Sequence, residues 1–217
     1  MTKRVLFFAA VAATSVLVAP VAASASSNIS AGSNISVASN ISAGSNISAA
    51  SAASSRPVTF RKGLTLNLPS SWTVYGKGTD WVHVVTGSCT RPTGGYNSAC
   101  DQFWILGPKA IELGHEVFNP YTPDQPYYPA TDVQPCPLNR RWGQAPGPLA
   151  DDGLRQVGPG HKAYYRDWNF GCVSYSSGKK KASYHQREWF LPKSKILVVD
   201  QWSTPGLAKV LKNATWQ

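Results

Sequence analysis

Residues 163–202 read AYYRDWNFGCVSY-SSGKKKA-SYHQREWFL-PKS-KILVVDQW, and three of these runs carry strand signals. They predict strands over Ala163–Tyr175, Ser183–Leu191 and Lys195–Trp202, because aromatic and β-branched residues recur between turn-forming residues. The segment Ser176–Lys181 combines glycine with serines and lysines, which is typical of the turn of a hairpin. This stretch therefore predicts three consecutive strands, the first two of them joined as a hairpin.

Earlier segments of the chain predict more strands. Leu64–Leu68 alternates leucine with polar residues, which is the period of a half-buried strand. Val58–Phe60 precedes it, and the short turn Arg61–Gly63 between the two predicts a hairpin. The other predicted strands are Trp81–Thr86 and Phe103–Leu106.

The C-terminal segment predicts a helix. Thr204 is a candidate N-cap, and Pro205 suits the first helical position. Apolar residues follow at the spacing of one helix face, namely Leu207, Val210, Leu211 and Ala214, with Trp216 closing that face. We expect the helix to lie across the sheet, and a sheet with such a helix makes the predicted fold class α+β.

The first 25 residues have the pattern of a secretory signal peptide. Lys3 and Arg4 precede an apolar run, Val5–Val18, and Ala23–Ala25 supplies a small-residue cleavage site. The run is shorter than the roughly 20 apolar residues that a transmembrane helix needs. We therefore predict that residues 1–25 direct export, and no later segment approaches the length of a membrane span.

A low-complexity segment follows at residues 26–55, where Ser-Asn-Ile-Ser recurs four times at intervals of six residues. One large apolar residue in each repeat buries too little surface to offset the entropy of ordering the chain. The composition therefore predicts a disordered spacer. A single globular domain is expected over residues 56–217.

Four cysteines, Cys89, Cys100, Cys136 and Cys172, fit an exported chain with two disulfides. Three pairings are possible. One is locally attractive, because Cys89 and Cys100 bracket a turn-rich loop with strand-like segments on both sides, which would leave Cys136 for Cys172. No two cysteines have the Cys-x2-Cys spacing of a zinc site, so we predict neither a metal nor another cofactor.

The stretch Phe118–Pro148 is rich in proline, at positions 120, 123, 126, 129, 135, 137, 146 and 148. Each proline removes a backbone donor, so the stretch predicts a long surface loop without strand pairing. Loops of this length are often functional. Its candidate ligand contacts are Tyr127, Tyr128, Arg140, Arg141 and Trp142.

The chain carries a formal net charge of +10, and removal of Lys3 and Arg4 with the signal peptide leaves +8. Such an excess favours binding to anionic polymers or membrane surfaces. The alternative is that it only keeps the protein soluble. The predicted hairpin turn concentrates charge at Lys179, Lys180 and Lys181, either as a solvated turn or as a contact for phosphate-rich wall polymers. We do not expect nucleic acid as a partner, because the sequence contains no recognisable nucleic-acid-binding module.

Most tryptophans lie in predicted strands, where we expect them to be core residues because each buries a large apolar area. These are Trp81, Trp104, Trp168, Trp189 and Trp202. His83 alternates with Trp81 and Val85, so it is expected to be a core or edge histidine. Arg187 and Asp200 lie in predicted strands and would form a cross-strand ion pair if those strands are neighbours.

The segment Gly63–Val74, GLTLNLPSSWTV, resembles the opening of Mog1/PsbP-like domains, in which a strand runs into a proline and a tryptophan-containing turn. The predicted strand Ile196–Trp202 and the helix after it resemble the C-terminal elements of such domains. The sequence pattern also resembles that of secreted actinobacterial proteins of that shape. The resemblance implies an antiparallel sheet with flanking helices and a C-terminal helix packed on the sheet. It also implies a binding or assembly role, with no catalytic residues to carry over.

The sequence contains no G-x-S-x-G or H-E-x-x-H motif. We therefore predict a secreted, non-catalytic binding or assembly protein that acts outside the cell or in loose association with the cell wall. Its expected partner is an anionic cell-wall polymer, a glycan or an extracellular protein. Two alternatives stay open: a secreted hydrolase that uses strand carboxylates such as Asp200, and an inhibitor that inserts its proline-rich loop into an extracellular protein.

Overall fold

The computed structural model describes residues 54–92 and 100–217, which belong to the second of two compact units of the chain, Ala50–Gln217. The predicted signal peptide, nearly all of the predicted spacer and part of the loop between Cys89 and Cys100 lie outside the described residues. In the part that is described, no helix is long and apolar enough to cross a membrane.

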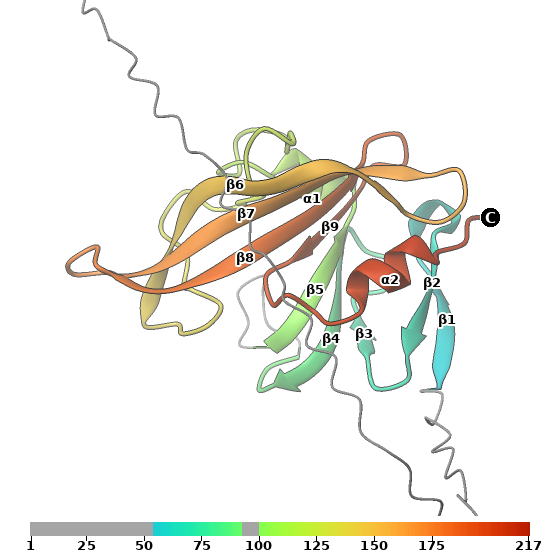
Figure 1. Ribbon diagram of the computed structural model, residues 1–217, viewed down its shortest axis with the longest axis horizontal. Helices are drawn as coiled ribbons and strands as arrows, with labels where there is room; N and C mark the ends of the chain where they lie inside the picture. Colours follow the sequence, from blue (N-terminus) through green and yellow to red (C-terminus); the bar gives the residue numbers. More distant parts are fainter. Residues whose placement is uncertain (1–53, 93–99) are drawn as a thin grey trace, which may run out of the picture. The chain divides into compact units, whose positions relative to one another are not determined.

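Most of this unit is a seven-stranded sheet with the strand order β3-β4-β5-β9-β8-β7-β6, and every neighbouring pair is antiparallel (Figure 1). The three strands predicted over residues 163–202 are confirmed as β7, β8 and β9. The strands are β3 (Thr73–Tyr75), β4 (Trp81–Cys89), β5 (Cys100–Leu106), β6 (Trp142–Gln156), β7 (Lys162–Ser174), β8 (Lys180–Leu191) and β9 (Ile196–Asp200).

A separate two-stranded hairpin of β1 (Ser55–Thr59) and β2 (Thr65–Pro69) confirms the predicted N-terminal hairpin. A 3-10 turn at Arg61–Gly63 joins the strands. Gly63 has a φ of +74°, and a Cβ there would lie 2.3 Å from the backbone oxygen of Gln217. The turn therefore requires glycine, both for its left-handed backbone and for the close approach of the C-terminus.

The predicted α+β class is wrong, because the fold is mostly β, with 50% strand and 9% helix. The described helices are short, α1 (Pro108–Glu112) and α2 (Leu207–Lys212). The predicted N-cap at Thr204 is also wrong, since its backbone N–H and its hydroxyl both donate to Asp200 instead. The chain turns there and enters α2 only after Gly206, whose φ is +79°.

Both faces of the sheet bear apolar clusters, because the alternation along each strand sends successive side chains to opposite sides. In β9, Ile196 and Val198 belong to one cluster, while Leu197 and Val199 belong to another. The first cluster includes residues of the β1–β2 hairpin and of α2, which meet this face of the sheet (Figure 1). The second includes Ala110 of α1 and residues of the segment 113–141, which we call the α1–β6 loop.

The prediction of a loop throughout Phe118–Pro148 is wrong in its last part, because β6 begins at Trp142. Pro146 lies opposite Phe170 of β7, and the register shifts just after it. β6 occupies the edge of the sheet, where a proline breaks no hydrogen bond between two flanking strands. The prolines therefore exclude a central strand, and an edge strand is compatible with them.

Both predicted disulfides are confirmed, and no described cysteine is free. Cys89 and Cys100 are directly paired residues of β4 and β5, so their bridge fastens the ends of that hairpin. The bridge from Cys136 to Cys172 ties the α1–β6 loop to β7.

Candidate functional site

Two of the predicted contact segments meet at one end of the sheet. Trp142, the first residue of β6, is paired with Ser174 of β7, and Val173 of β7 is paired with Lys180 of β8. The β7–β8 turn therefore lies beside the start of β6, and Figure 1 places this turn at the end of the sheet away from α2. We call this region the basic end: Arg140, Arg141, Trp142, Tyr175 and Lys179–Lys181.

The cations of the basic end are exposed, and none forms an ion pair with another described residue. Tyr175 was not predicted as a contact, although it is 54% exposed. Its ring lies against the backbone of β6, where a Cβ on Gly143 would approach Cε1 to 3.0 Å. The basic end thus combines an aromatic ring with unpaired positive charges.

The predicted aromatic contacts Tyr128 and Trp142 are half-buried. Both pack against a core cluster formed by Cys136, Trp168, Phe170, Cys172 and Tyr184. The Tyr128 hydroxyl donates to the backbone oxygen of Asp132 and accepts from the N–H of Gln134, each at 2.8 Å. These rings are therefore held in place, and only part of each reaches solvent.

Tyr127 is fully buried, so its prediction as a surface contact is wrong. Its N–H donates to Glu188 Oε1 at 2.7 Å, and its hydroxyl donates to the carbonyl of Ala110 at 3.3 Å. The side chain thereby fills the cluster beneath the α1–β6 loop. The two adjacent tyrosines therefore differ in burial: Tyr127 is fully buried, whereas part of Tyr128 reaches solvent.

Glu188 is a charged residue inside a predicted strand, and it is a fully buried carboxylate of β8. Oε2 accepts from the Tyr121 hydroxyl at 2.8 Å and from Trp168 Nε1 at 3.1 Å. Oε1 accepts from the Tyr127 N–H and from Gln186 Nε2, each at 2.7 Å. Burial raises the pKa of Glu188 to about 7, and the hydrogen bonds from these donors oppose that rise. The carboxylate fastens the α1–β6 loop to the sheet.

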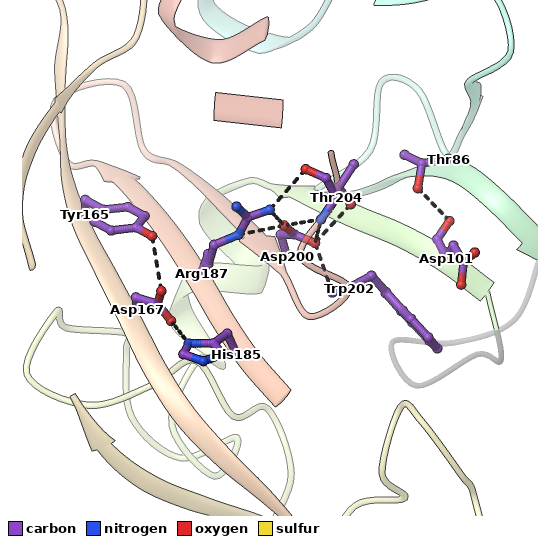
Figure 2. Close-up of polar contacts among 9 residues, drawn as sticks. All are labelled: Thr86, Asp101, Tyr165, Asp167, His185, Arg187, Asp200, Trp202 and Thr204. Atoms are coloured by element: carbon purple, nitrogen blue, oxygen red, sulfur yellow. Dashed lines mark hydrogen bonds and ion pairs between the residues drawn. The ribbon is translucent and has the colours of Figure 1, made fainter. Parts of the chain in front are cut away.

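The expected pair of Arg187 and Asp200 is present on neighbouring strands (Figure 2). Asp200 is fully buried and accepts from Arg187, from the N–H of Trp202 at 3.0 Å, and from the N–H and hydroxyl of Thr204, each at 3.0 Å. Both carboxylate oxygens are therefore occupied by donors. Asp200 therefore acts as a structural anchor, and it is not a free carboxylate of the kind that the hydrolase alternative requires.

A second polar group on the same face joins Tyr165, Asp167 and His185 (Figure 2). His185 Nδ1 donates to Asp167 Oδ1 at 2.8 Å, and the Tyr165 hydroxyl lies 3.5 Å from Asp167 Oδ2. A carboxylate that orients an imidazole is part of many nucleophilic sites. Within the described residues, however, no hydroxyl or thiol bonds to His185, so this pair lacks a nucleophile.

His83 is buried, as expected for a core histidine. Its ring stacks on Tyr75 at 5.0 Å between centroids, contacts Trp104 at 4.8 Å, and its Nε2 donates to the carbonyl of Pro92. Burial lowers the pKa of His83. These contacts are structural.

The sequence also gave no signal for a tight turn at the start of the α1–β6 loop. His115 and Asn119 exchange backbone hydrogen bonds at 2.9 and 3.0 Å, while Glu116 and Val117 have φ of 50° and 56°. Positive φ is costly for a β-branched residue such as Val117. The turn presents Phe118, which is 75% exposed.

No family model, no curated protein and no solved structure matches this chain. The resemblance to Mog1/PsbP-like domains therefore stays a prediction. The geometry of the described residues is the basis for the function proposed next.

Proposed function

We propose that this chain is an exported, non-catalytic binding protein that attaches to an anionic polymer of the cell envelope through its basic end. The observation that carries the proposal is the convergence of exposed cations from two distant segments, none paired with a described acid. Unpaired cations create a positive potential that a polyanion neutralises. The two disulfides support export, because they suit an oxidising compartment.

A linear polymer fits this surface better than a single small anion. Arg140 and Arg141 precede β6, whereas Lys179 lies in the β7–β8 turn and Lys180 and Lys181 begin β8, so the charges are spread over the ends of neighbouring strands. Each cation can then meet a separate phosphate or carboxylate of a repeating chain. Tyr175 and the exposed part of Trp142 offer apolar surface to the sugar or glycerol units between those charges.

The salt dependence of such binding can be estimated. For a flexible polyanion, each neutralised charge contributes about −0.7 to the slope of log affinity against log salt concentration. Five cations would give a slope of about −3.5, so an increase from about 50 to about 200 mM salt would weaken binding about 100-fold. Binding through aromatic stacking alone would change little over that range.

The test is equilibrium binding of the full chain to labelled poly(glycerol phosphate), measured by fluorescence anisotropy over a salt series. Replacing Lys179, Lys180 and Lys181 by alanine removes three charges, so the slope should fall to about −1.4. The matched control removes three exposed lysines elsewhere: Lys77→Ala, Lys193→Ala and Lys209→Ala. Equal losses in the two variants, or a salt-independent affinity in the wild type, would contradict the proposal.

Neutral dextran serves as a second probe. Binding to dextran that survives salt and is lost in Trp142→Ala would replace the anionic polymer with a glycan as the partner. If neither polymer binds, the basic end is not a polymer site. The exposed Phe118 turn would then become the surface to examine for an extracellular protein partner.

A further inference from the structure

A pocket of about 420 Å³ opens on the face of the sheet that carries α2, and it shares no residue with the basic end. Strands β6, β7 and β8 and helix α2 each contribute to it. The lining side chains that matter here are Asp151, Leu154, Arg155, Tyr165, Arg187 and Lys212.

Arg187 is held rigidly in the floor of this pocket. Its Nε donates to Asp200 Oδ2 at 3.0 Å, and its Nη2 donates to the same oxygen and to the carbonyl of Thr204 at 3.1 Å. The remaining nitrogen, Nη1, has no hydrogen-bond partner among the described residues, and Figure 2 shows it on the side of the guanidinium away from Asp200. A donor fixed in this way loses little entropy when it binds a ligand.

Two further cations line the same pocket. The guanidinium carbon of Arg155 lies 4.7 Å from the centroid of the Tyr165 ring, and its Nη2 pairs with Asp151 at 2.9 Å. Lys212, in the last turn of α2, is exposed and forms no ion pair with a described residue. Arg155 is paired with Asp151 and Arg187 with buried Asp200. Among the cations that line the pocket, Lys212 is therefore the one without an acid partner in the described residues.

The electrostatics of Tyr165 agree with this arrangement. Burial and the nearby Asp167 raise the pKa of its hydroxyl to about 12, while Arg187 and Arg155 act in the opposite direction. The positive groups are thus close enough to one ring to influence its ionisation. Leu154, which is 54% exposed, adds apolar surface at the rim.

We propose that this pocket binds a small organic anion, in which a carboxylate or phosphate meets Arg187 and Lys212 and an attached apolar group covers Leu154. The pocket shares no residue with the basic end, so binding of a small anion can be tested separately from binding of a polymer. The ligand is a discrete molecule, because the pocket is bounded by α2 and by the strands beneath it.

The test is titration calorimetry of the full chain with phenyl phosphate and with benzoate, using benzyl alcohol as the uncharged control. At least one of the two anions should bind saturably at one site, and the stronger one identifies the preferred acid. Lys212→Gln should weaken that binding about fivefold, the loss expected for one partly exposed charge contact. Lys209→Gln, on the same helix but outside the pocket, is the matched control and should change affinity by less than about twofold.

The variant that lacks Lys179, Lys180 and Lys181 should bind the small anion as the wild type does, which separates the two sites. Three results would overturn the proposal: no saturation with either anion, equal effects of the Lys212 and Lys209 substitutions, or equally tight binding of benzyl alcohol. Because both lysines are exposed, neither substitution should prevent folding.

Discussion

An increase in pH from about 5 to about 8 should destabilise this fold through one buried side chain, Glu188. Burial raises its pKa from 4.5 to about 7 in the folded protein. At about 1.4 kcal/mol for each pH unit, that difference corresponds to about 3 kcal/mol of unfolding free energy. A change of this size is a large part of the stability of a typical domain.

The sign follows from where the proton is held. Below pH 4.5, Glu188 is protonated in both the folded and the unfolded chain. Between 4.5 and about 7, the folded chain keeps a proton that the unfolded chain has released, so stability decreases as pH rises. Above about 7, the folded protein carries a buried charge, and the full contribution of about 3 kcal/mol has been lost.

The assay is urea unfolding at several pH values between 5 and 8, for the wild type and for Glu188→Gln. Burial lowers the pKa of His83 and His115, which reduces stability as pH falls below about 6.5, the opposite trend. Both proteins share this histidine effect, so the difference between their unfolding free energies isolates Glu188.

At pH 5 the glutamine variant should be less stable than the wild type, because its amide nitrogen would face a donor such as Trp168 Nε1. This deficit should shrink toward pH 8, because only the wild type loses the contribution of Glu188. The cost of this misplaced amide does not depend on pH, so the prediction is tested by how the unfolding free energy changes with pH. Glu112→Gln removes an exposed carboxylate from α1 and is the matched control. If the wild-type and Glu188→Gln curves run parallel from pH 5 to 8, the four donors fully compensate burial and the reasoning fails.

Two more predictions concern covalent and ionic links within the sheet. Replacement of Cys136 and Cys172 by alanine should cost about 4 kcal/mol of unfolding free energy, and replacement of Cys89 and Cys100 about 3 kcal/mol. The difference arises because the bridges close loops of 36 and 11 residues, respectively. Chemical denaturation measures both losses, and a larger loss for the shorter loop would contradict the prediction. Arg187→Met should cost about 3 to 5 kcal/mol, since it leaves the buried carboxylate of Asp200 without its cation; a thermal midpoint within about 2 °C of the wild type would show that the hydrogen bonds to Asp200 suffice alone.

The strands were predictable where local alternation matches the final burial. Leu66 and Leu68 of β2, and Leu64 just before it, alternate in sequence and are all fully buried. The edge strand β6 was missed because Pro146 and Pro148 indicate a loop, and their position at the sheet edge is a property of the whole topology. The start of α2 was missed for a different reason: the Thr204 hydroxyl donates to Asp200, four residues earlier, and Gly206 takes the N-cap position.

The candidate site was predictable only in its parts. Two runs, Arg140–Trp142 and Lys179–Lys181, stand out in the sequence, yet their proximity depends on the pairing of Trp142 with Ser174. Tyr127 and Tyr128 have nearly the same sequence context. Tyr127 is the one whose backbone is bonded to Glu188, a residue that no local pattern connects with either tyrosine.

The positive surface of this protein depends as much on where its acids lie as on its lysines. The chain has 21 basic and 11 acidic side chains. Asp200 and Glu188 are fully buried. Asp200 is paired with Arg187, and Glu188 is covered by the α1–β6 loop. Exposed Asp151 is paired with Arg155 beside the pocket. Acids that are buried or already paired offset the free cations less than exposed, unpaired acids would, and this favours a positive potential at the basic end.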